Sequence, residues 1–234
     1  MNGASDVAGD SLTFDDVLVV IPAWNEAPVI EQVVKSVLIE FPHVLVIDDG
    51  SSDGTAELAA AAGARTAVHA LNLGQGGALA TGLDVARQLP WVRWVVTFDA
   101  DGQHLAGDAA RMVDIARRDN LDVVLGTRFS GGTTNAGRWR RMTLRAATAY
   151  TRWSTGLKVT DTHNGLRVLS REFAARLHLR ERGMGHASEI LDQIAEQSAQ
   201  WVEVPVDITY TQYSVAKGQP ISNAVTILFD RLMR

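Results

Sequence analysis

The amino-acid sequence predicts an α/β protein whose mostly parallel central sheet is flanked by helices. Strand-like and helix-like patterns alternate along the first hundred residues, which is typical of such a sheet. The strand-like runs are short, rich in Val and Ile, and end in polar loops, as expected for buried strands. With 234 residues, 46% of them hydrophobic, the chain is long enough to bury a sizeable core, and we expect one catalytic-size domain.

The first strand and helix are marked by a proline and by helical periodicity. We expect a strand at Val17–Ile21, ended by Pro22, and a helix capped by Asn25. Apolar residues then recur at helical spacing at Val29, Ile30, Val33, Val34, Val37 and Leu38. The second predicted strand is Val44–Ile47.

A polar loop follows the second strand. Residues 48–55 are rich in turn-forming and helix-capping side chains, and they lead into an alanine-rich helix at about 56–62. Gly63 closes this helix, and Arg65–Val68 is the third predicted strand.

A glycine-rich loop, residues 72–77, leads into the next predicted helix at about 78–89. Its glycines allow a ligand to approach the backbone, and a helix amino terminus favours an anion there. Further strands are expected at Trp94–Phe98 and Val123–Gly126, with a helix at about 109–118 between them.

The net charge of −5 conceals an uneven distribution. Residues 126–182 hold twelve Lys and Arg against three acidic residues, a local charge of +9, so the remainder carries −14. Concentrated positive charge suits phosphates or an anionic membrane surface, and a solvated basic face is the alternative. Nucleic acid is not an expected partner, because the chain is acidic overall and shows no recognisable nucleic-acid motif.

Two amphipathic helices are predicted in the second half. On the first, Arg138, Arg141, Arg145 and Arg152 form a basic stripe. On the second, an apolar stripe is formed by Ile221, Val225, Leu228 and Leu232. Such a helix can lie on a membrane or against a membrane partner, or it can pack on the domain's own core.

The composition excludes several classes of chemistry. The chain has no cysteine, so disulfides, thiolate zinc sites and cysteine nucleophiles are excluded, and catalysis must rest on carboxylates, Arg, Lys, His or a metal. Residues 1–13 show no signal-peptide pattern, and no apolar run approaches the roughly 20 residues that cross a bilayer. We therefore expect a soluble or peripheral protein.

The strongest chemical signal is the abrupt end of the strand at Trp94–Phe98. Two carboxylates follow, Asp99 and Asp101, and Gln103 can add a carbonyl oxygen. Strand ends at the carboxyl edge of an open α/β sheet bind ligands, and Mg²⁺ or Mn²⁺ favours carboxylates together with substrate phosphates. These residues therefore suggest a clamp for a metal-bound diphosphate, although an ordinary turn has a similar composition.

The order of four motifs resembles the family 2 glycosyltransferases. The motifs are Ile21-Pro22-Ala23-Trp24-Asn25-Glu26, Asp48-Asp49-Gly50-Ser51-Ser52-Asp53-Gly54-Thr55, Asn72-x-Gly-x-Gly-Gly, and Asp99-Ala100-Asp101-Gly102-Gln103-His104. Three further motifs are similar to the branch with dolichol-phosphate mannose synthases and bacterial polyprenyl-phosphate glycosyltransferases: Gly126-Thr127-Arg128-Phe129, Asp161-Thr162-His163-Asn164-Gly165-Leu166-Arg167 and Glu203-Val204-Pro205-Val206. The resemblance covers about residues 17–217.

The resemblance implies a GT-A fold, a nucleotide-diphosphate-sugar donor, a divalent metal (Mg²⁺ or Mn²⁺) and inversion at the anomeric carbon. It places these residues beside the donor: Pro22, Ala23, Trp24, Glu26, Asp48, Asp49, Asn72, Gly74, Asp99, Ala100 and Asp101. Asp49 is the main candidate for the base or ribose, because strand-end carboxylates accept hydrogen bonds from ribose hydroxyls. Asp99, Asp101 and Gln103 are the implied metal ligands. For Asp53 and Thr55 we expect helix capping instead.

The resemblance also implies four catalytic residues: Asp101, Arg128, Glu189 and Lys217. Negative charge grows on the departing diphosphate while the sugar ring becomes cation-like, so a metal and fixed cations lower the barrier. Arg128 and Lys217 match positions near the phosphates, with a surface salt bridge and a plain connector loop as the respective alternatives. Glu189 lies where related hydroxyl-acceptor enzymes carry a base, but Ser188 stands in place of the usual second acidic residue.

The acceptor side is implied to include Asp161, His163, Asn164 and Arg167. Arg167 is the best candidate for a second phosphate contact, while His163 can also be an ordinary hydrogen-bonded loop histidine. A lipid monophosphate is already ionised and can attack directly, whereas a sugar hydroxyl needs a base.

We expect an inverting, metal-dependent transferase that moves a hexose from a UDP- or GDP-sugar to polyprenyl phosphate at the cytoplasmic membrane face. A separate membrane protein is a candidate anchor. The expected organisation is a disordered tail at 1–13, a GT-A domain at 14–218 and an amphipathic helix at 219–234. The alternatives are a family 2 enzyme with a saccharide hydroxyl acceptor and a catalytically silent nucleotide-sugar-binding module.

Overall fold

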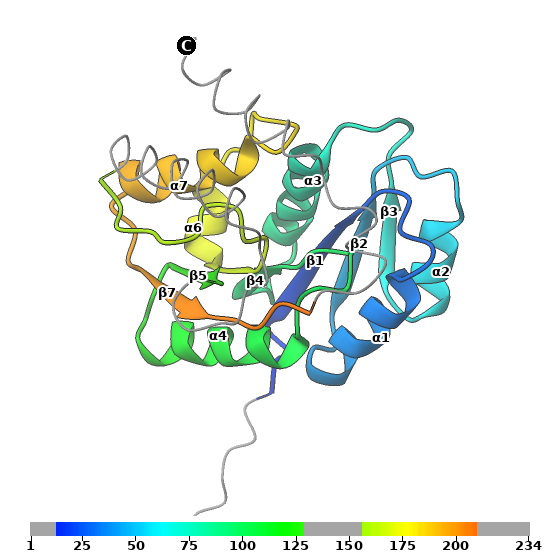
Figure 1. Ribbon diagram of the computed structural model, residues 1–234. Coiled ribbons are helices and arrows are strands. Elements are labelled where there is room, and N and C mark those ends of the chain that lie inside the picture. The colour runs from blue at the N-terminus through cyan, green and yellow to red at the C-terminus, as the bar shows by residue number, and fades with distance from the viewer. Residues whose placement is uncertain (1–12, 129–155, 210–234) are drawn as a thin grey trace, which may run out of the picture.

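A seven-stranded sheet forms the centre of the protein in the computed structural model, which describes residues 13–128 and 156–209 (Figure 1). The strands follow the spatial order β3-β2-β1-β4-β6-β5-β7. Their bounds are β1 Val17–Ala23, β2 Val44–Asp48, β3 Arg65–Val68, β4 Trp94–Thr97, β5 Val123–Thr127, β6 Arg167–Ser170 and β7 Trp201–Pro205. Of these described strands, β6 alone runs antiparallel to its neighbours, which confirms the predicted mostly parallel sheet.

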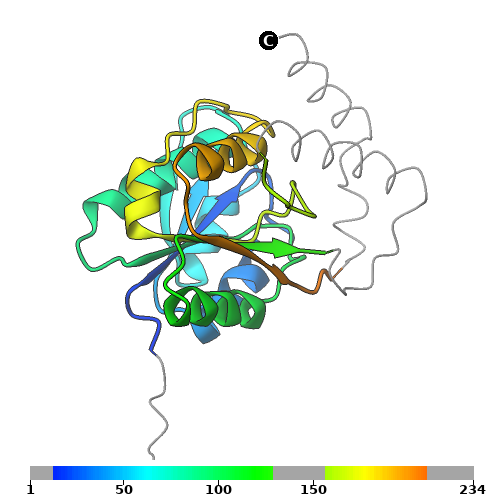
Figure 2. The ribbon, with the colours of Figure 1, turned by 90° about the vertical axis from the view of Figure 1, so that its left-hand side faces the viewer.

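Helices cover both faces of the sheet, as the edge-on view in Figure 2 shows. The described helices are α1 Ile30–Glu40, α2 Thr55–Ala61, α3 Gln75–Gln88, α4 Ala106–Arg118, α6 Arg171–Arg176 and α7 His186–Glu196. Helices α1, α2 and α4 contribute to one hydrophobic cluster, and α3, α6 and α7 contribute to the other. The structure is therefore three layers with the sheet in the middle.

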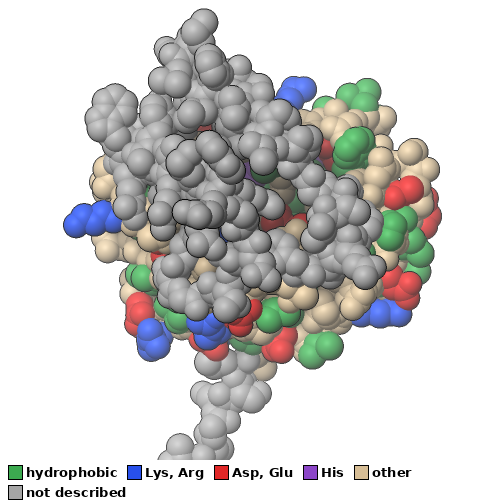
Figure 3. Space-filling view, in the orientation of Figure 1, with side chains coloured by type: hydrophobic (Ala, Val, Ile, Leu, Met, Phe, Trp, Pro, Cys, Tyr) green, Lys and Arg blue, Asp and Glu red, His purple; other side chains and the backbone are tan. Residues whose placement is uncertain are grey.

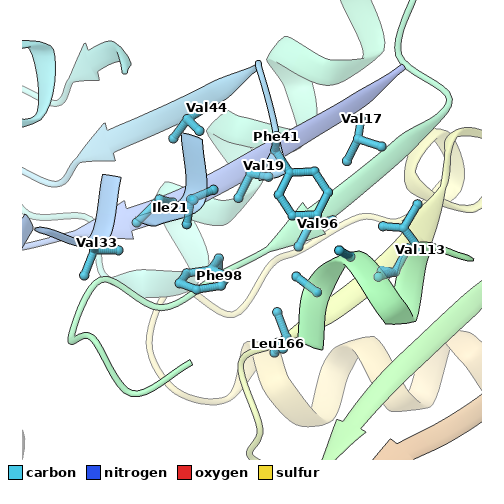
Figure 4. Packing of buried hydrophobic residues seen from close by; sticks show 14 of the residues in the cluster. Val17, Val19, Ile21, Val33, Phe41, Val44, Val96, Phe98, Val113 and Leu166 are labelled. Atoms are coloured by element: carbon cyan, nitrogen blue, oxygen red, sulfur yellow. The ribbon is translucent and has the colours of Figure 1, made fainter. Parts of the chain in front are cut away.

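Strand β1 shows why the apolar runs are continuous. Val17, Val19 and Ile21 point into the cluster beneath α1 and α4 (Figure 4), whereas Leu18 and Val20 belong to the cluster on the other face. All seven residues of β1 are buried, because alternate side chains enter two different cores.

The contact between α3 and β1 leaves no room for a side chain at Gly82. A Cβ atom there would lie 2.2 Å from Cγ1 of Val20. We expect Gly82→Ala to destabilise the fold by about 1–3 kcal/mol, because overpacking outweighs the better helix propensity of alanine. Urea unfolding measures this change, and a second substitution, Val20→Ala, should recover part of the loss. An unchanged midpoint for Gly82→Ala would contradict the packing argument.

Some predicted boundaries were wrong. Asn25 does not cap the first helix: α1 begins at Ile30, and Asn25 instead accepts a hydrogen bond from the backbone N–H of Ser52 at 3.0 Å. Helices α3 and α4 each begin three residues before their predicted starts at residues 78 and 109. Strands β6 and β7 and helices α6 and α7 were not predicted as elements.

Several predicted features lie outside the described residues. They are residues 1–12 of the tail predicted at 1–13, the basic stripe Arg138–Arg152, Lys217 and the apolar stripe Ile221–Leu232. Among the helices that the structure describes, none combines the length and apolar character needed to cross a bilayer. On the face shown in Figure 3, acidic, basic and apolar side chains are interspersed over α1 and α2.

Candidate active site

The loops after β1, β2 and β4 meet at the carboxyl edge of the sheet. Ala23 pairs with Asp48, and Val20 pairs with Thr97, so the chain segments that follow these strands emerge together. Ligands of open α/β sheets bind at this edge. The predicted donor-side residues are thus brought together by the parallel register.

Asp99 is held by contacts from three other parts of the chain. Its Oδ1 accepts a hydrogen bond from Nε2 of Gln75 at 3.0 Å, and its Oδ2 lies 3.0 Å from Nε2 of His104. The backbone of Gly165 lies against the carboxylate, because a Cβ there would be 2.1 Å from Oδ2. The side chain keeps 27% exposure, so it is both fixed and accessible to a ligand.

The two carboxylates after β4 have opposite pKa shifts. Burial, followed by the nearby charge of Asp99, raises the pKa of Asp101 from 3.8 to about 6. Burial also acts to raise the pKa of Asp99, but the hydrogen bond and charge of His104, with the charge of Arg167, lower it below its ordinary value. The pair therefore concentrates negative charge, which a bound cation would relieve.

The donor set fits a divalent metal that is shared with a substrate. Within residues 13–128 and 156–209, no three His, Cys, Asp or Glu side chains are arranged to hold an ion by themselves. Mg²⁺ commonly takes only one or two carboxylates and completes its coordination with water and phosphate oxygens. The backbone N–H of Gln103 donates to Oδ1 of Asp101 at 3.1 Å, and its carbonyl accepts from Thr209 at 2.9 Å. This places Gln103 beside the pair.

The loop after β1 is hydrogen-bonded to the loop after β2. The N–H of Asn25 donates to Oγ of Ser51 at 2.9 Å, and the N–H of Glu26 donates to Oγ1 of Thr55 at 2.9 Å. Asp53 accepts from the N–H of Thr55 at 3.1 Å, but the residue that caps α2 is Gly54, without a side-chain cap hydrogen bond, so the expected capping by Asp53 and Thr55 was wrong. Trp24 is 51% exposed in this loop. Its neighbours in the sequence, Pro22 and Ala23 at the end of β1 and Glu26 after it, are buried.

The side chain of Asp49, which follows β2, is bound by the chain segment that follows β3. Its Oδ1 lies 2.7 Å from Nδ1 of His69 and accepts from the N–H of Leu73 at 2.8 Å, while Oδ2 accepts from Gly74 at 2.7 Å. Asn72 accepts from the same Gly74 N–H at 3.0 Å. Asp49, Asn72 and Gly74 thus lie together, and a donor contact for each stays a prediction.

The other predicted donor carboxylate, Asp48, also makes a local contact. It is 1% exposed and accepts from the N–H of Ser51 at 2.7 Å. Ala100, between the two carboxylates of the β4 loop, is 4% exposed and packs in the core.

The amino terminus of α3 differs from the expected anion site. The N–H groups of Gly76 and Gly77 donate to the carbonyl of Arg182, at 2.7 and 3.3 Å. The protein's own backbone therefore occupies two of the first-turn donors that we expected an anion to use. The loop before α7, residues 178–185, is packed on this helix end.

Arg128 and Asp161 form a buried ion pair. Nε and Nη2 of Arg128 donate to the two oxygens of Asp161 at 2.7 and 2.8 Å, and Asp161 is 4% exposed. Burial opposes the charge of Asp161, yet the hydrogen bonds and charge of Arg128 lower its pKa below the ordinary value. Glu203 supports this pair by accepting from the N–H groups of Thr160 and Asp161 at 2.7 and 3.1 Å. A phosphate contact for Arg128 stays a prediction.

Arg167 lies between the two acidic groups. It is 3% exposed, burial lowers its pKa to about 10, and the charges of Asp99 and Asp161 both act on it in the opposite direction. Its Nη1 is buried and has no hydrogen-bond partner in the described part of the chain. The predicted acceptor-side residues are thus adjacent to the predicted donor side.

The remaining acceptor-side residues surround this arginine. The N–H of His163 donates to Oδ1 of Asp161 at 3.2 Å, and burial lowers the pKa of His163. Asn164 accepts from the N–H of Leu166 at 2.9 Å, and its buried Nδ2 lacks a partner among the described residues.

Four residues near the carboxylates were not singled out by the sequence: Gln75, His104, Gly165 and His186. His104 ends the Asp99 motif and Gly165 lies in the Asp161 motif, so both motifs contained a signal. His186 begins α7, and its Nδ1 donates to the carbonyl of Gly183 at 2.7 Å. Burial, followed by the charge of Arg167, lowers the pKa of His186 to about 4, so it is neutral near pH 7.

Glu189 occupies the first turn of α7 but binds backbone. Its carboxylate accepts from the N–H of Arg180 at 2.9 Å and from the N–H of Glu181 at 3.0 Å. This contact faces the loop before α7. A role of Glu189 as a base on the acceptor stays a prediction.

Comparison with known proteins decides the family. The model of Glycosyl transferase family 2 matches residues 18–177, more than half of the chain. The chain belongs to this family. It is therefore a glycosyltransferase, and the resemblance seen in the motifs is confirmed.

Family 2 relatives of this chain include named enzymes. The UDP-N-acetylglucosamine–dolichyl-phosphate N-acetylglucosaminyltransferase of Methanococcus voltae is 29% identical over 93% of this chain and 95% of its own length. The polyprenol monophosphomannose synthase of Mycolicibacterium smegmatis is 31% identical over 86% of this chain and 80% of its own length. A crystal structure of glucosyl-3-phosphoglycerate synthase from Mycobacterium tuberculosis with Mg²⁺ and uridine diphosphate has a TM-score of 0.70 at 21% identity, covering 93% and 79% of the two chains. The predicted GT-A fold is confirmed.

Proposed function

We propose that this glycosyltransferase moves a hexose from a nucleotide-diphosphate sugar to polyprenyl phosphate at the cytoplasmic face of the membrane, with inversion. The names of the two relatives support this proposal, because one names dolichyl phosphate with the sugar nucleotide and the other names polyprenol monophosphomannose as what is made. The proposal includes membrane attachment through the surface of the protein or through a separate anchoring protein.

The observation that carries the proposal is the buried guanidinium of Arg167 beside Asp99. Its Nη1 has no partner among the described residues, and a buried donor without an acceptor is costly. The phosphate of the acceptor lipid would accept a hydrogen bond from Nη1. It would then lie next to the carboxylates that serve the diphosphate of the sugar nucleotide. Arginine suits this task, because its planar group matches phosphate oxygens.

The residues of the site have distinct tasks in this reaction. A divalent metal, Mg²⁺ or Mn²⁺, held by Asp101 and Asp99 would neutralise charge that develops on the departing diphosphate. Gln75 and His104 orient Asp99 for this contact. Arg167 holds the acceptor phosphate so that the attacking phosphate oxygen faces the sugar. Direct attack by an ionised phosphate needs no base, which agrees with a Glu189 that binds backbone N–H groups.

Transfer to a lipid tests the proposal. The full chain is incubated with Mn²⁺, undecaprenyl phosphate and radiolabelled UDP-glucose, UDP-N-acetylglucosamine or GDP-mannose in turn. We expect label to enter the organic phase with one of these donors. Transfer to soluble saccharides with none to undecaprenyl phosphate would contradict the proposal.

A thermal-shift measurement identifies the donor class independently. UDP and GDP are each added with and without Mn²⁺, and the preferred base raises the apparent melting temperature more by mass action. A metal-dependent shift with either nucleotide supports the predicted donor site.

A further inference from the structure

The contacts of Glu189 identify a route from α7 to the carboxylate Asp99. The carboxylate of Glu189 accepts from the N–H groups of two successive residues, Arg180 and Glu181. The three contacts, between 2.9 and 3.0 Å, are charge-assisted, because a carboxylate accepts from backbone N–H groups. These hydrogen bonds fix the backbone of residues 180 and 181, and with it the position of the residue that follows them.

The next residue of that backbone binds the amino terminus of α3. The carbonyl of Arg182 accepts from Gly76 at 2.7 Å and from Gly77 at 3.3 Å. The fit is close enough to exclude side chains, because a Cβ at Gly74 would lie 2.4 Å from this carbonyl oxygen and a Cβ at Gly76 would lie 2.0 Å from that of Glu181. The glycines of this loop therefore admit the protein's own backbone.

The first residue of α3 then reaches the candidate metal site. Gln75 directly precedes the two glycines, and its Nε2 donates to Oδ1 of Asp99 at 3.0 Å. We propose that Glu189 is a positioning residue, which sets Gln75 against Asp99 through the backbone of residues 180–182. The consequence for catalysis rests on the proposed function, whereas the structural coupling does not.

Hydrogen exchange tests the coupling without donor, metal or acceptor. In Glu189→Ala, the amides of Gly76 and Gly77 should exchange faster than in the wild type, because the carbonyl that accepts from them is no longer held. A peptide covering residues 72–80 reports this change. Glu196→Ala removes an exposed carboxylate from the last turn of the same helix and serves as the matched control, with unchanged exchange.

Kinetics separate positioning from base catalysis. We expect Glu189→Ala and Gln75→Ala each to lower kcat/KM for the donor by about tenfold, the lower range for partners that orient a metal ligand. The double variant should lose little more than either single variant, because both substitutions interrupt one route. Glu189→Gln keeps one acceptor oxygen and should lose less than Glu189→Ala. Any fall in rate at low pH, the acidic limb of the pH–rate profile, should be the same as in the wild type.

Two results would overturn the proposal. The first is unchanged exchange at Gly76 and Gly77 in Glu189→Ala. The second is an equal loss of kcat in the Gln and Ala variants together with loss of the acidic limb, which would show Glu189 acting directly on the acceptor. If the wild type transfers sugar to no tested acceptor, the exchange measurement still decides the structural coupling.

Discussion

Asp101→Asn is expected to lower kcat by about 10³-fold while it raises the melting temperature. Charge stabilisation by a metal is worth several kcal/mol in the transition state, and each ~1.4 kcal/mol is a factor of ten in rate. The amide keeps the size of the side chain but loses the charge that binds the cation. Steady-state kinetics with saturating Mn²⁺ and donor measure the loss, and the Mn²⁺-dependent thermal shift should disappear.

The rise in stability follows from the pKa of Asp101. Its folded pKa is about 6 against an ordinary value of 3.8, so the folded state holds the proton more tightly than the unfolded chain. That stabilisation is present below about pH 4 and is lost as the pH rises through about 6, where the ionised group opposes folding. The asparagine variant should therefore be more stable than the wild type at pH 7, on the order of 2 kcal/mol, and the difference should vanish toward pH 4.

The difference between the two proteins reports on Asp101 together with its neighbour Asp99, because the titration of His163 and His186 is common to both. Urea unfolding at several pH values without metal gives the difference directly. A variant that is inactive and less stable than the wild type at pH 7 would contradict the argument, since the loss of activity would then follow from damage to the fold.

Gly165→Ala is the second substitution with a large expected effect. The new Cβ would lie 2.1 Å from Oδ2 of Asp99 and 2.4 Å from its Cγ, so the carboxylate must move. The φ of Gly165 lies outside the left-handed region, so alanine strains this contact and not the backbone. We expect kcat/KM to fall by about 10²-fold and stability by about 1–3 kcal/mol.

Gly107→Ala is the matched control for that experiment. Gly107 lies in α4, and a Cβ there meets no atom within 4 Å. Alanine should leave activity unchanged and stabilise the helix by about 0.5–1 kcal/mol. Calorimetric titration of Mn²⁺ with nucleotide should show weaker binding for the Gly165 variant only. Equal affinities in the wild type and Gly165→Ala would exclude the proposed contact as a determinant of the site.

The sequence predicts best where one strong local pattern is present. Strands β1 to β5 and helices α1 to α4 were recognised because apolar periodicity is bounded by Pro, Gly and polar turns. Strand β6 was missed because it begins with the buried Arg167, and β7 was missed because it carries Glu203 in its centre. In each strand a charged side chain interrupts the apolar pattern: Arg167 is buried with its Nη1 lacking a partner among the described residues, and Glu203 accepts from the N–H groups of Thr160 and Asp161.

The candidate site shows the same limit. Asp99 and Asp101 stand out because an apolar strand ends abruptly at them, but the groups that orient Asp99 are distant in sequence. Gln75 lies 24 residues before it, and the Gly165 backbone reaches it from the chain that precedes β6. The local sequence predicts that Asn25 caps a helix, whereas its side-chain oxygen accepts a hydrogen bond from the N–H of Ser52, 27 residues away. Contacts between residues so far apart leave no periodic pattern in the sequence, so the sequence does not predict them.

The antiparallel direction of β6 has a consequence for acceptor choice. Because Arg167 pairs with Thr97, the chain enters β6 at the same edge where it leaves β4, and Oγ1 of Thr97 binds the carbonyl of Gly165 at 2.6 Å. The end of β5 and the start of β6 therefore both lie at the carboxyl edge of the sheet, beside the candidate site. We therefore expect that the sequence between β5 and β6 can change, and acceptor preference with it, while strands β1 to β4 keep the proposed donor side in place.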